Sequence, residues 1–207
     1  MTATPEAPRF LPCGERAFLI EYHDPGAVRA ALEAADLRAE LVPAARTVLV
    51  RVAHPGALDG VRGQAERLLA GPPAPVPAEA SRTVVVPVRY TGEDLANVAE
   101  LTGLTTAEVV AAHTARPWRV AFGGFAPGFA YLDGGDPRLA VPRRASPRTE
   151  VPAGSVGLAG EYSGVYPRAS PGGWQLIGRT EVVLWDAART PPALLRPGCW
   201  VRFEEVR

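Results

Sequence analysis

The sequence contains no lysine, since all 22 of its basic residues are arginine. This absence excludes every mechanism that depends on a lysine amine, including a Schiff base, a pyridoxal-phosphate anchor and the phosphate-binding lysine of Walker A loops and kinases. The basic residues are balanced by 22 acidic ones, and a formal net charge of zero gives no indication of a nucleic-acid partner. Any anionic ligand must therefore be held by arginines or backbone amides.

Cysteine and histidine are also scarce. The two cysteines, Cys13 and Cys199, form no CxxC motif, and the three histidines, His23, His54 and His113, are too scattered to predict a metal site. No apolar run approaches the roughly 20 residues of a membrane span, and the N-terminus lacks the basic and apolar segments of a secretory signal. We expect a soluble cytoplasmic protein with two buried, unpaired thiols and no membrane partner.

The first 70 residues predict alternating strands and helices. Runs of β-branched and aromatic residues indicate strands at 17–22 and 47–52. Asp24 followed by proline is typical of a helix N-terminus, and apolar spacing over 61–69 predicts a second helix that ends before Gly71. We expect a small α/β sandwich with the helices on one face of the sheet.

Proline then interrupts the chain. Residues 71–77 contain four prolines, which favours a stiff connector between two domains, predicted at 1–75 and 81–207. A strand over 83–90 opens the second domain, and Pro87 restricts that strand to a sheet edge or a bulge. The predicted fold class is α+β, a small N-terminal α/β domain followed by a mainly β domain.

Two helices precede the β-rich region. A short helix is predicted over 93–101, and Thr105 with Glu108 forms a capping box at the start of the next helix, which ends by Pro117. Glycine and proline then separate short apolar runs at regular intervals, which indicates a barrel or sandwich. The strand candidates are 118–122, 155–159, 174–177, 182–185 and 200–203.

Residues 123–179 hold the densest concentration of glycine, aromatic residues and arginine. The segment 123–132 can expose backbone amides to an anion, or it can be a barrel corner that fills its core with aromatic rings. Arg143, Arg144 and Arg148 are the strongest candidates for binding a carboxylate or phosphate, with a solvated surface loop as the alternative. The same alternatives apply to the turn 170–174, which is either an anion-binding turn or a hairpin.

Two further residues carry possible chemistry. His113 lies in an apolar helical context, where it is either a general acid or base or a structural residue at a helix C-terminus. Ser155 is preceded by Ala-Gly rather than by the Gly-x of a nucleophile elbow, so we exclude a serine hydrolase. No residue receives a catalytic assignment.

Long C-terminal motifs resemble the family of 5-oxoprolinase B subunits, which is similar to allophanate hydrolase subunit 1 and to carboxyltransferase domains. The resemblance rests on GFAPGFAYL from Gly124, SPRTEVPAGSVGLAG from Ser146, YSGVYP from Tyr162 and SPGGWQLIGRT from Ser170, with further matches at GERAFLIEY and VPVRYTGEDL. It implies a cyclophilin-like barrel. It also implies a non-autonomous subunit that works with the A and C subunits of 5-oxoprolinase to open 5-oxo-L-proline to L-glutamate, with hydrolysis of ATP to ADP and phosphate.

The resemblance further implies ATP as a co-substrate, with Mg²⁺ supplied by the nucleotide. Alternatives are inhibition of a sensor histidine kinase and a carboxyltransferase-type module that acts on urea-like amides. The resemblance implies these substrate- or nucleotide-binding residues: His113, Phe125, Pro127, Gly128, Phe129, Tyr131, Arg143, Arg148, Ser155, Tyr166, Pro171, Gly172, Gly173, Trp174 and Arg179.

Overall fold

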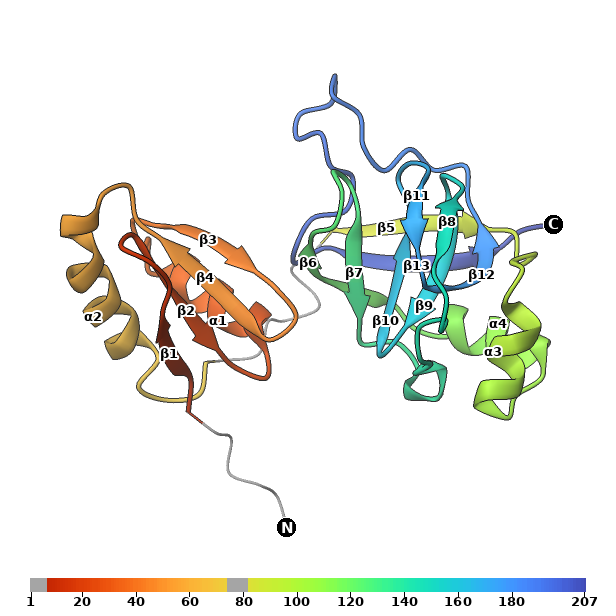
Figure 1. Ribbon diagram of the computed structural model, residues 1–207, viewed down its shortest axis with the longest axis horizontal. Helices are drawn as coiled ribbons and strands as arrows, with labels where there is room; N and C mark the ends of the chain where they lie inside the picture. The colour runs from red at the N-terminus through yellow and green to blue at the C-terminus, as the bar shows by residue number, and fades with distance from the viewer. Residues whose placement is uncertain (1–6, 74–81) are drawn as a thin grey trace, which may run out of the picture. The chain divides into compact units, whose positions relative to one another are not determined.

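The computed structural model describes residues 7–73 and 82–207, and the chain divides between Ala78 and Glu79 into two compact units (Figure 1). One unit is a small sheet with helices, and the other is a barrel, so the predicted α+β fold is confirmed. The predicted ends of the two domains, residues 75 and 81, fall in the segment outside the described residues, and these bounds stay a prediction.

The N-terminal unit is a four-stranded antiparallel sheet of order β1-β2-β4-β3 with two α-helices. Its elements are β1 (Arg9–Pro12), β2 (Ala17–Glu21), α1 (Pro25–Ala34), β3 (Glu40–Pro43), β4 (Thr47–Arg51), the 3₁₀ turn η1 (Pro55–Ala57) and α2 (Leu58–Leu68). The sequence predicted β2, α1, β4 and α2 but missed the outer strands β1 and β3.

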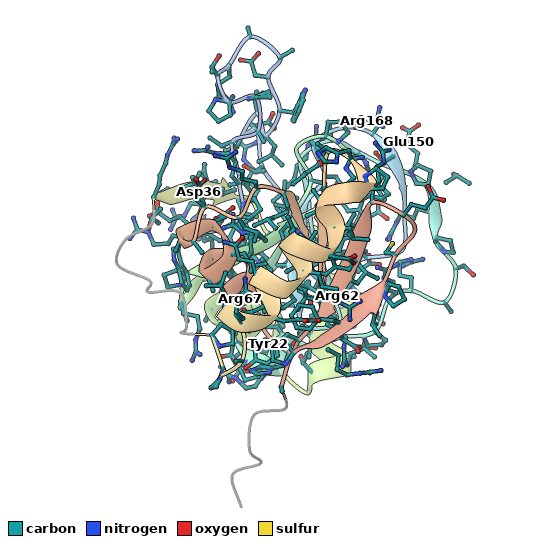
Figure 2. All side chains as sticks on the ribbon, turned by 90° about the vertical axis from the view of Figure 1, so that its left-hand side faces the viewer. Tyr22, Asp36, Arg62, Arg67, Glu150 and Arg168 are labelled. Carbon is teal, nitrogen blue, oxygen red and sulfur yellow. The ribbon has the colours of Figure 1, made fainter. Side chains whose placement is uncertain are left out.

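The Asp24 side chain caps the start of α1, and apolar contacts hold both helices against the sheet. The Asp24 side chain accepts a hydrogen bond from the Ala27 amide at 3.2 Å, as the Asp-Pro pair predicted. One apolar core joins Phe18 of β2 to residues of β4, α1 and α2, so both helices cover the same sheet face. On the exposed side of α2, Arg62 pairs with Glu66 one turn away at 2.9 Å (Figure 2).

The C-terminal unit is built on a seven-stranded sheet of order β12-β9-β10-β7-β6-β13-β5, beside a two-stranded sheet of β11 and β8. Its elements are β5 (Thr83–Val88), α3 (Leu95–Thr102), α4 (Thr106–Thr114), β6 (Trp118–Gly123), β7 (Ala130–Asp133), the 3₁₀ turn η3 (Pro137–Leu139), β8 (Arg148–Val151), β9 (Ser155–Ala159), β10 (Tyr162–Val165), β11 (Ser170–Gly172), β12 (Gln175–Arg179) and β13 (Trp200–Glu205).

The large sheet closes on itself to form the barrel. β5 is the last strand and pairs with β13 in parallel, which leaves Pro87 on the edge where the sequence predicted it. Just beyond that strand, Arg89 and Arg179 exchange two backbone hydrogen bonds of 2.9 Å, so the chain after β5 meets the end of β12. This bridge joins the two ends of the sheet.

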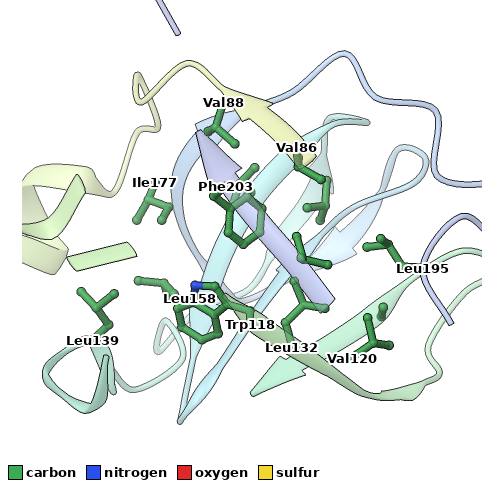
Figure 3. Packing of buried hydrophobic residues seen from close by; sticks show 14 of the residues in the cluster. Val86, Val88, Trp118, Val120, Leu132, Leu139, Leu158, Ile177, Leu195 and Phe203 are labelled. Atoms are coloured by element: carbon green, nitrogen blue, oxygen red, sulfur yellow. The ribbon is translucent and has the colours of Figure 1, made fainter. Parts of the chain in front are cut away.

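The barrel encloses an apolar core. Trp118 and Phe203 are each 1% exposed and lie among aliphatic residues from β5, β7 and β9 (Figure 3). Two short helices lie beside the barrel, with α3 against β12 and α4 against β13 (Figure 1). Thr105 and Glu108 form the predicted capping box, in which the Thr105 hydroxyl accepts from the Glu108 amide at 3.2 Å and the Glu108 carboxylate accepts from the Thr105 amide at 2.8 Å.

Two local predictions are wrong. The segment 182–185 is not a strand, because its pairing is confined to a single bridge between Trp185 and Ala193, and Val183 is 60% exposed. The thiol of Cys13 is exposed, since it lies just after a strand at the sheet edge, whereas Cys199 is buried as predicted. Both cysteines are free.

Candidate functional site

The loop between β6 and β7 holds the glycine and aromatic residues that the sequence singled out. Its backbone turns where the Ala126 amide donates to the Gly124 carbonyl at 2.7 Å and the Phe129 amide donates to the Ala126 carbonyl at 3.0 Å. Phe125 has a φ of 65°, which is uncommon for a residue with a side chain, and it is 58% exposed. The loop therefore presents one aromatic ring to solvent.

Five of the predicted residues meet in one aromatic cluster, which consists of Phe125, Phe129, Tyr131, Tyr166 and Trp174. Phe129 lies at its centre, with ring centroids 5.1 to 5.4 Å from those of the other four, and all four contacts are edge-to-face. Each such contact adds roughly 0.5–1.5 kcal/mol beyond the burial of area. The aromatic cluster thus anchors the β6–β7 loop to the ends of β10 and β12.

Close backbone approach explains the glycines around the aromatic cluster. A Cβ at Gly172 would overlap the Tyr166 hydroxyl, and a Cβ at Gly128, where φ is 85°, would lie 2.8 Å from the Trp185 Cβ. Gly173 lies against Pro147, while Pro127 and Pro171 are exposed at the two loops. These predicted residues therefore shape the walls of the cluster rather than offer reactive groups.

Tyr166 contributes a buried hydroxyl to the aromatic cluster and is 2% exposed. Burial raises the pKa of its hydroxyl above the usual range, although a hydrogen bond from the Trp174 backbone and the nearby guanidinium of Arg143 act in the opposite direction. The hydroxyl is therefore protonated at neutral pH. It can donate a hydrogen bond but cannot act as a base.

A buried carboxylate organises the arginines next to the cluster. Asp94, which is 3% exposed, accepts hydrogen bonds from Arg144 at 2.6 Å, from Arg148 at 2.9 Å and from the Leu176 amide at 2.7 Å. Burial raises the pKa of Asp94, but these hydrogen bonds and the two positive charges outweigh burial and hold the pKa below its usual range. Asp94 is therefore ionised and ties α3 to residues 142–148, the arginine loop, which carries Arg143, Arg144 and Arg148.

The arginine loop also carries guanidinium N–H groups that have no hydrogen-bond partner in the described part of the chain. Arg148 also pairs with Glu93 at 3.1 Å, yet its Nη1 and the Nε of Arg144 are buried and have no hydrogen-bond partner in the described part of the chain. Arg143 is exposed and forms no ion pair with any of residues 7–73 and 82–207. The arginine loop can thus offer donors to a carboxylate or phosphate, mainly from Arg143.

His113 lies away from this surface, in the barrel core. Its ring is fully buried, with Nδ1 2.7 Å from the Tyr90 hydroxyl and Nε2 2.8 Å from the Ser163 hydroxyl, and it stacks on Phe203 at a centroid distance of 4.3 Å. Burial lowers the pKa of His113 to about 3. The imidazole is neutral at pH 7 and hydrogen-bonds the Tyr90 and Ser163 hydroxyls. Of the two roles that the sequence allowed, general acid or base and structural residue, these contacts support the structural one.

Ser155 and Arg179 lie beside each other in the large sheet. They are cross-strand partners at the ends of β9 and β12, and Ser155 is buried. On its other side Ser155 meets Tyr166 of the aromatic cluster, whose amide donates to the Ser155 carbonyl at 2.9 Å. Arg179 therefore lies two strand spacings, about 10 Å, from the Tyr166 backbone, although Trp174 lies at the opposite end of β12.

Sequence reasoning missed the residues that hold these sites together. Asp94 holds the arginine loop in place, and the available signal was its acidic side chain at the start of the helix predicted over 93–101. Tyr90 and Ser163, the partners of His113, gave no local signal because one follows β5 and the other lies in β10, far apart in the sequence. Among the described residues, no group of three histidines, cysteines or carboxylates could hold a metal ion, and no helix is long and apolar enough to cross a membrane.

This chain is similar to known proteins in both its sequence and its fold. The family described as carboxyltransferase domain, subdomain C and D, matches residues 8–195. The 5-oxoprolinase B subunit of Escherichia coli O157:H7 is 53% identical over 126 residues, which cover 59% of this chain and 58% of that protein. The 5-oxoprolinase B subunit of Bacillus subtilis strain 168 is 48% identical over 128 residues, or 60% of this chain and 53% of that protein.

The matched region thus spans a little over half the length of these relatives. Among solved structures, TTHA0988 is 39% identical with a TM-score of 0.75, and the alignment covers 93% of this chain and 40% of that one. These matches confirm the resemblance that the C-terminal motifs indicated. The chain belongs to the carboxyltransferase domain, subdomain C and D, family.

Proposed function

We propose that this chain is the B subunit of a heteromeric 5-oxoprolinase that opens 5-oxo-L-proline to L-glutamate with hydrolysis of ATP to ADP and phosphate. The observation that carries this proposal is the identity of 48–53% to two relatives that are named as the B subunit of 5-oxoprolinase. The reaction, its substrate and its co-substrate come from the resemblance. Because the reaction would consume ATP, we place the assembly in the cytoplasm.

The site geometry favours a chain that does not work alone. Around the aromatic cluster, Tyr166 is held protonated, Asp94 is committed to two arginines and His113 lies in the core, so none of them is a free acid or base. Ring-opening of a lactam requires proton transfer and a nucleophile. We therefore propose that the A and C subunits supply these groups.

The chain's own residues are suited to bind and orient an anion. An unactivated lactam resists water, and phosphorylation of its oxygen would make that oxygen part of a leaving group. Negative charge develops in such a step, and guanidinium and amide donors stabilise it without a lysine. Arg143 is the exposed donor beside Tyr166, and we propose that it orients the carboxylate of the substrate or a phosphate of ATP, with Mg²⁺ arriving on the nucleotide.

Phe125 gives the loop a second role. Its ring is 58% exposed yet rests edge-on against Phe129 and Tyr166 at 5.2 and 6.0 Å. An exposed aromatic ring on an anchored base is the kind of residue that dominates protein interfaces. We propose that a partner subunit covers Phe125 and excludes water from Arg143.

A reconstitution assay tests the function. The purified A and C subunits and this chain would be mixed with 5-oxoproline and ATP, and the release of both glutamate and ADP would be measured with each component omitted in turn. We expect substrate-dependent release of both products only when this chain is present. Unchanged turnover in its absence would overturn the proposal, as would turnover by this chain alone.

A carboxyltransferase-type module acting on urea-like amides is the second candidate, and the family's own description favours it. That reaction would need a biotin-bearing partner to supply the carboxyl group. The two functions differ in their partners and in their products. Biotin-dependent carboxylation of urea by the reconstituted assembly, without release of glutamate from 5-oxoproline, would favour the second candidate.

A further inference from the structure

The barrel closes at a fixed seam between the chain that follows β5 and the end of β12. Arg89 and Arg179 donate their backbone amides to each other's carbonyls at 2.9 Å. A Cβ at Gly92 would overlap the Leu176 carbonyl, and a Cβ at Gly178 would overlap the Val88 side chain. Glycine at both positions lets the two backbones meet, so the seam holds its residues in a defined register.

This register places two positive charges side by side. In an antiparallel pair that exchanges both hydrogen bonds, the two Cα atoms are about 5.5 Å apart and the side chains extend from the same face. Like charges directly opposite each other destabilise such a pair. Arg89 and Arg179 are both exposed, which is compatible with two guanidinium groups on the outer face of the barrel.

No acidic side chain forms an ion pair with either arginine in the described part of the chain. Arg89 Nε donates a hydrogen bond of 3.3 Å to a main-chain oxygen of Arg207, the last residue of the sequence. Arginine keeps its charge at any physiological pH. The seam therefore carries two positive charges that no acidic side chain balances.

A hollow of about 350 Å³ opens beside the two arginines. Its walls are Pro87, Arg89, Thr91, Arg179, Thr180, Glu181 and Val206. It contains two arginines against one glutamate, so it is positive overall, and the Thr91 hydroxyl is exposed as a further donor. The planar guanidinium fork matches the oxygens of carboxylates and phosphates.

We propose that this hollow is a binding site for a small oxyanion, a phosphate or a carboxylate, which Arg89 and Arg179 hold between them. The bound anion would relieve the repulsion that the seam imposes. The walls of the hollow share no residue with the aromatic cluster or the arginine loop, although Arg179 lies only two strands from Tyr166. The hollow is therefore distinct from the loop that the proposed function uses, and its existence does not depend on that function.

Titration of the full chain with inorganic phosphate and, separately, with acetate tests the site. Calorimetry at low ionic strength would compare the wild type with Arg89→Gln and Arg179→Gln. Arg168→Gln is the matched control, because Arg168 is exposed in the same unit and its loss changes the net charge equally. The two anions distinguish a phosphate site from a carboxylate site.

We expect the wild type to bind at least one of the two anions, and each seam variant to bind it about tenfold or more weakly, because a hydrogen bond to a charged group is lost. Arg168→Gln should bind as the wild type does. Absence of binding to both anions, equal binding by the seam variants, or equal weakening by Arg168→Gln would overturn the proposal.

Thermal unfolding gives a second readout that separates a lost ligand site from a misfolded variant. Removing one of two repelling charges should leave the Tm of Arg179→Gln, measured without anion, equal to or above that of the wild type. The bound anion should then raise the Tm of the wild type but not of the variant. A lower Tm without anion, or an equal rise in both proteins, would contradict the site.

Discussion

Acidification should destabilise the barrel through His113, whose ring is fully buried against Phe203 and two hydroxyls. Burial lowers its pKa from 6.5 to about 3 in the folded protein. Between these two values the unfolded chain binds one proton more than the folded chain, so stability falls as the pH falls. The stability is fully present above pH 6.5 and is lost as the pH drops toward the folded pKa.

The change of the unfolding free energy with pH sets the size of the effect. One proton corresponds to about 1.4 kcal/mol per pH unit, so at about pH 5 the barrel should have lost roughly 2 kcal/mol relative to about pH 7.5. All four tryptophans, Trp118, Trp174, Trp185 and Trp200, lie in the barrel unit. Urea titrations followed by tryptophan emission therefore report the free energy of unfolding of that unit at each pH.

The comparison uses His113→Gln, which cannot take up the proton, and His23→Gln as a control, since His23 is exposed in the other unit. We expect the wild type and His23→Gln to lose about 2 kcal/mol more than His113→Gln over this pH interval. Equal losses in His113→Gln and the wild type would refute the reasoning. Should His113→Gln fail to fold, a wild-type stability that is the same at both pH values would refute it.

Three further predictions concern single side chains. Asp94→Asn removes the charge that two arginines share and should lower the free energy of unfolding by about 3 kcal/mol in urea titrations, whereas a loss below about 1 kcal/mol would contradict a shared buried ion pair. Thr105→Ala breaks the capping box with Glu108 and should cost about 1 kcal/mol by thermal unfolding, with an unchanged Tm as the opposing result. Phe125→Ser should leave stability within about 0.5 kcal/mol yet weaken association with the partner subunits in sedimentation experiments; undiminished association would exclude the loop from the interface.

Sequence reasoning succeeded where the determinants are local. Asp24 and its following proline, and Thr105 with Glu108, act within one helical turn, so adjacent residues predict both helix starts. β3 and β11 are four and three residues long, and each contains a proline. Strands this short contain too few residues for an alternating pattern, and a proline argues against a strand, so the local sequence did not reveal them.

In the candidate site too, the features set by neighbouring residues were predicted and those set by distant residues were not. The sequence grouped the aromatic residues correctly because the loop itself carries Phe125, Phe129 and Tyr131, and Phe129 contacts the remaining rings. It could not place Arg179, because only the pairing of β12 with β9 sets that residue beside Ser155. Nor could it find Asp94, whose arginine partners are about 50 residues away.

Titration of this chain into fixed amounts of the A and C subunits tests the proposed function most directly. With 5-oxoproline and ATP in excess, the rate of glutamate release should rise from the baseline as the chain is added and then reach a plateau, with ADP released in step. A rate that stays at the baseline, or one that is already maximal before the chain is added, would contradict its assignment as the missing subunit.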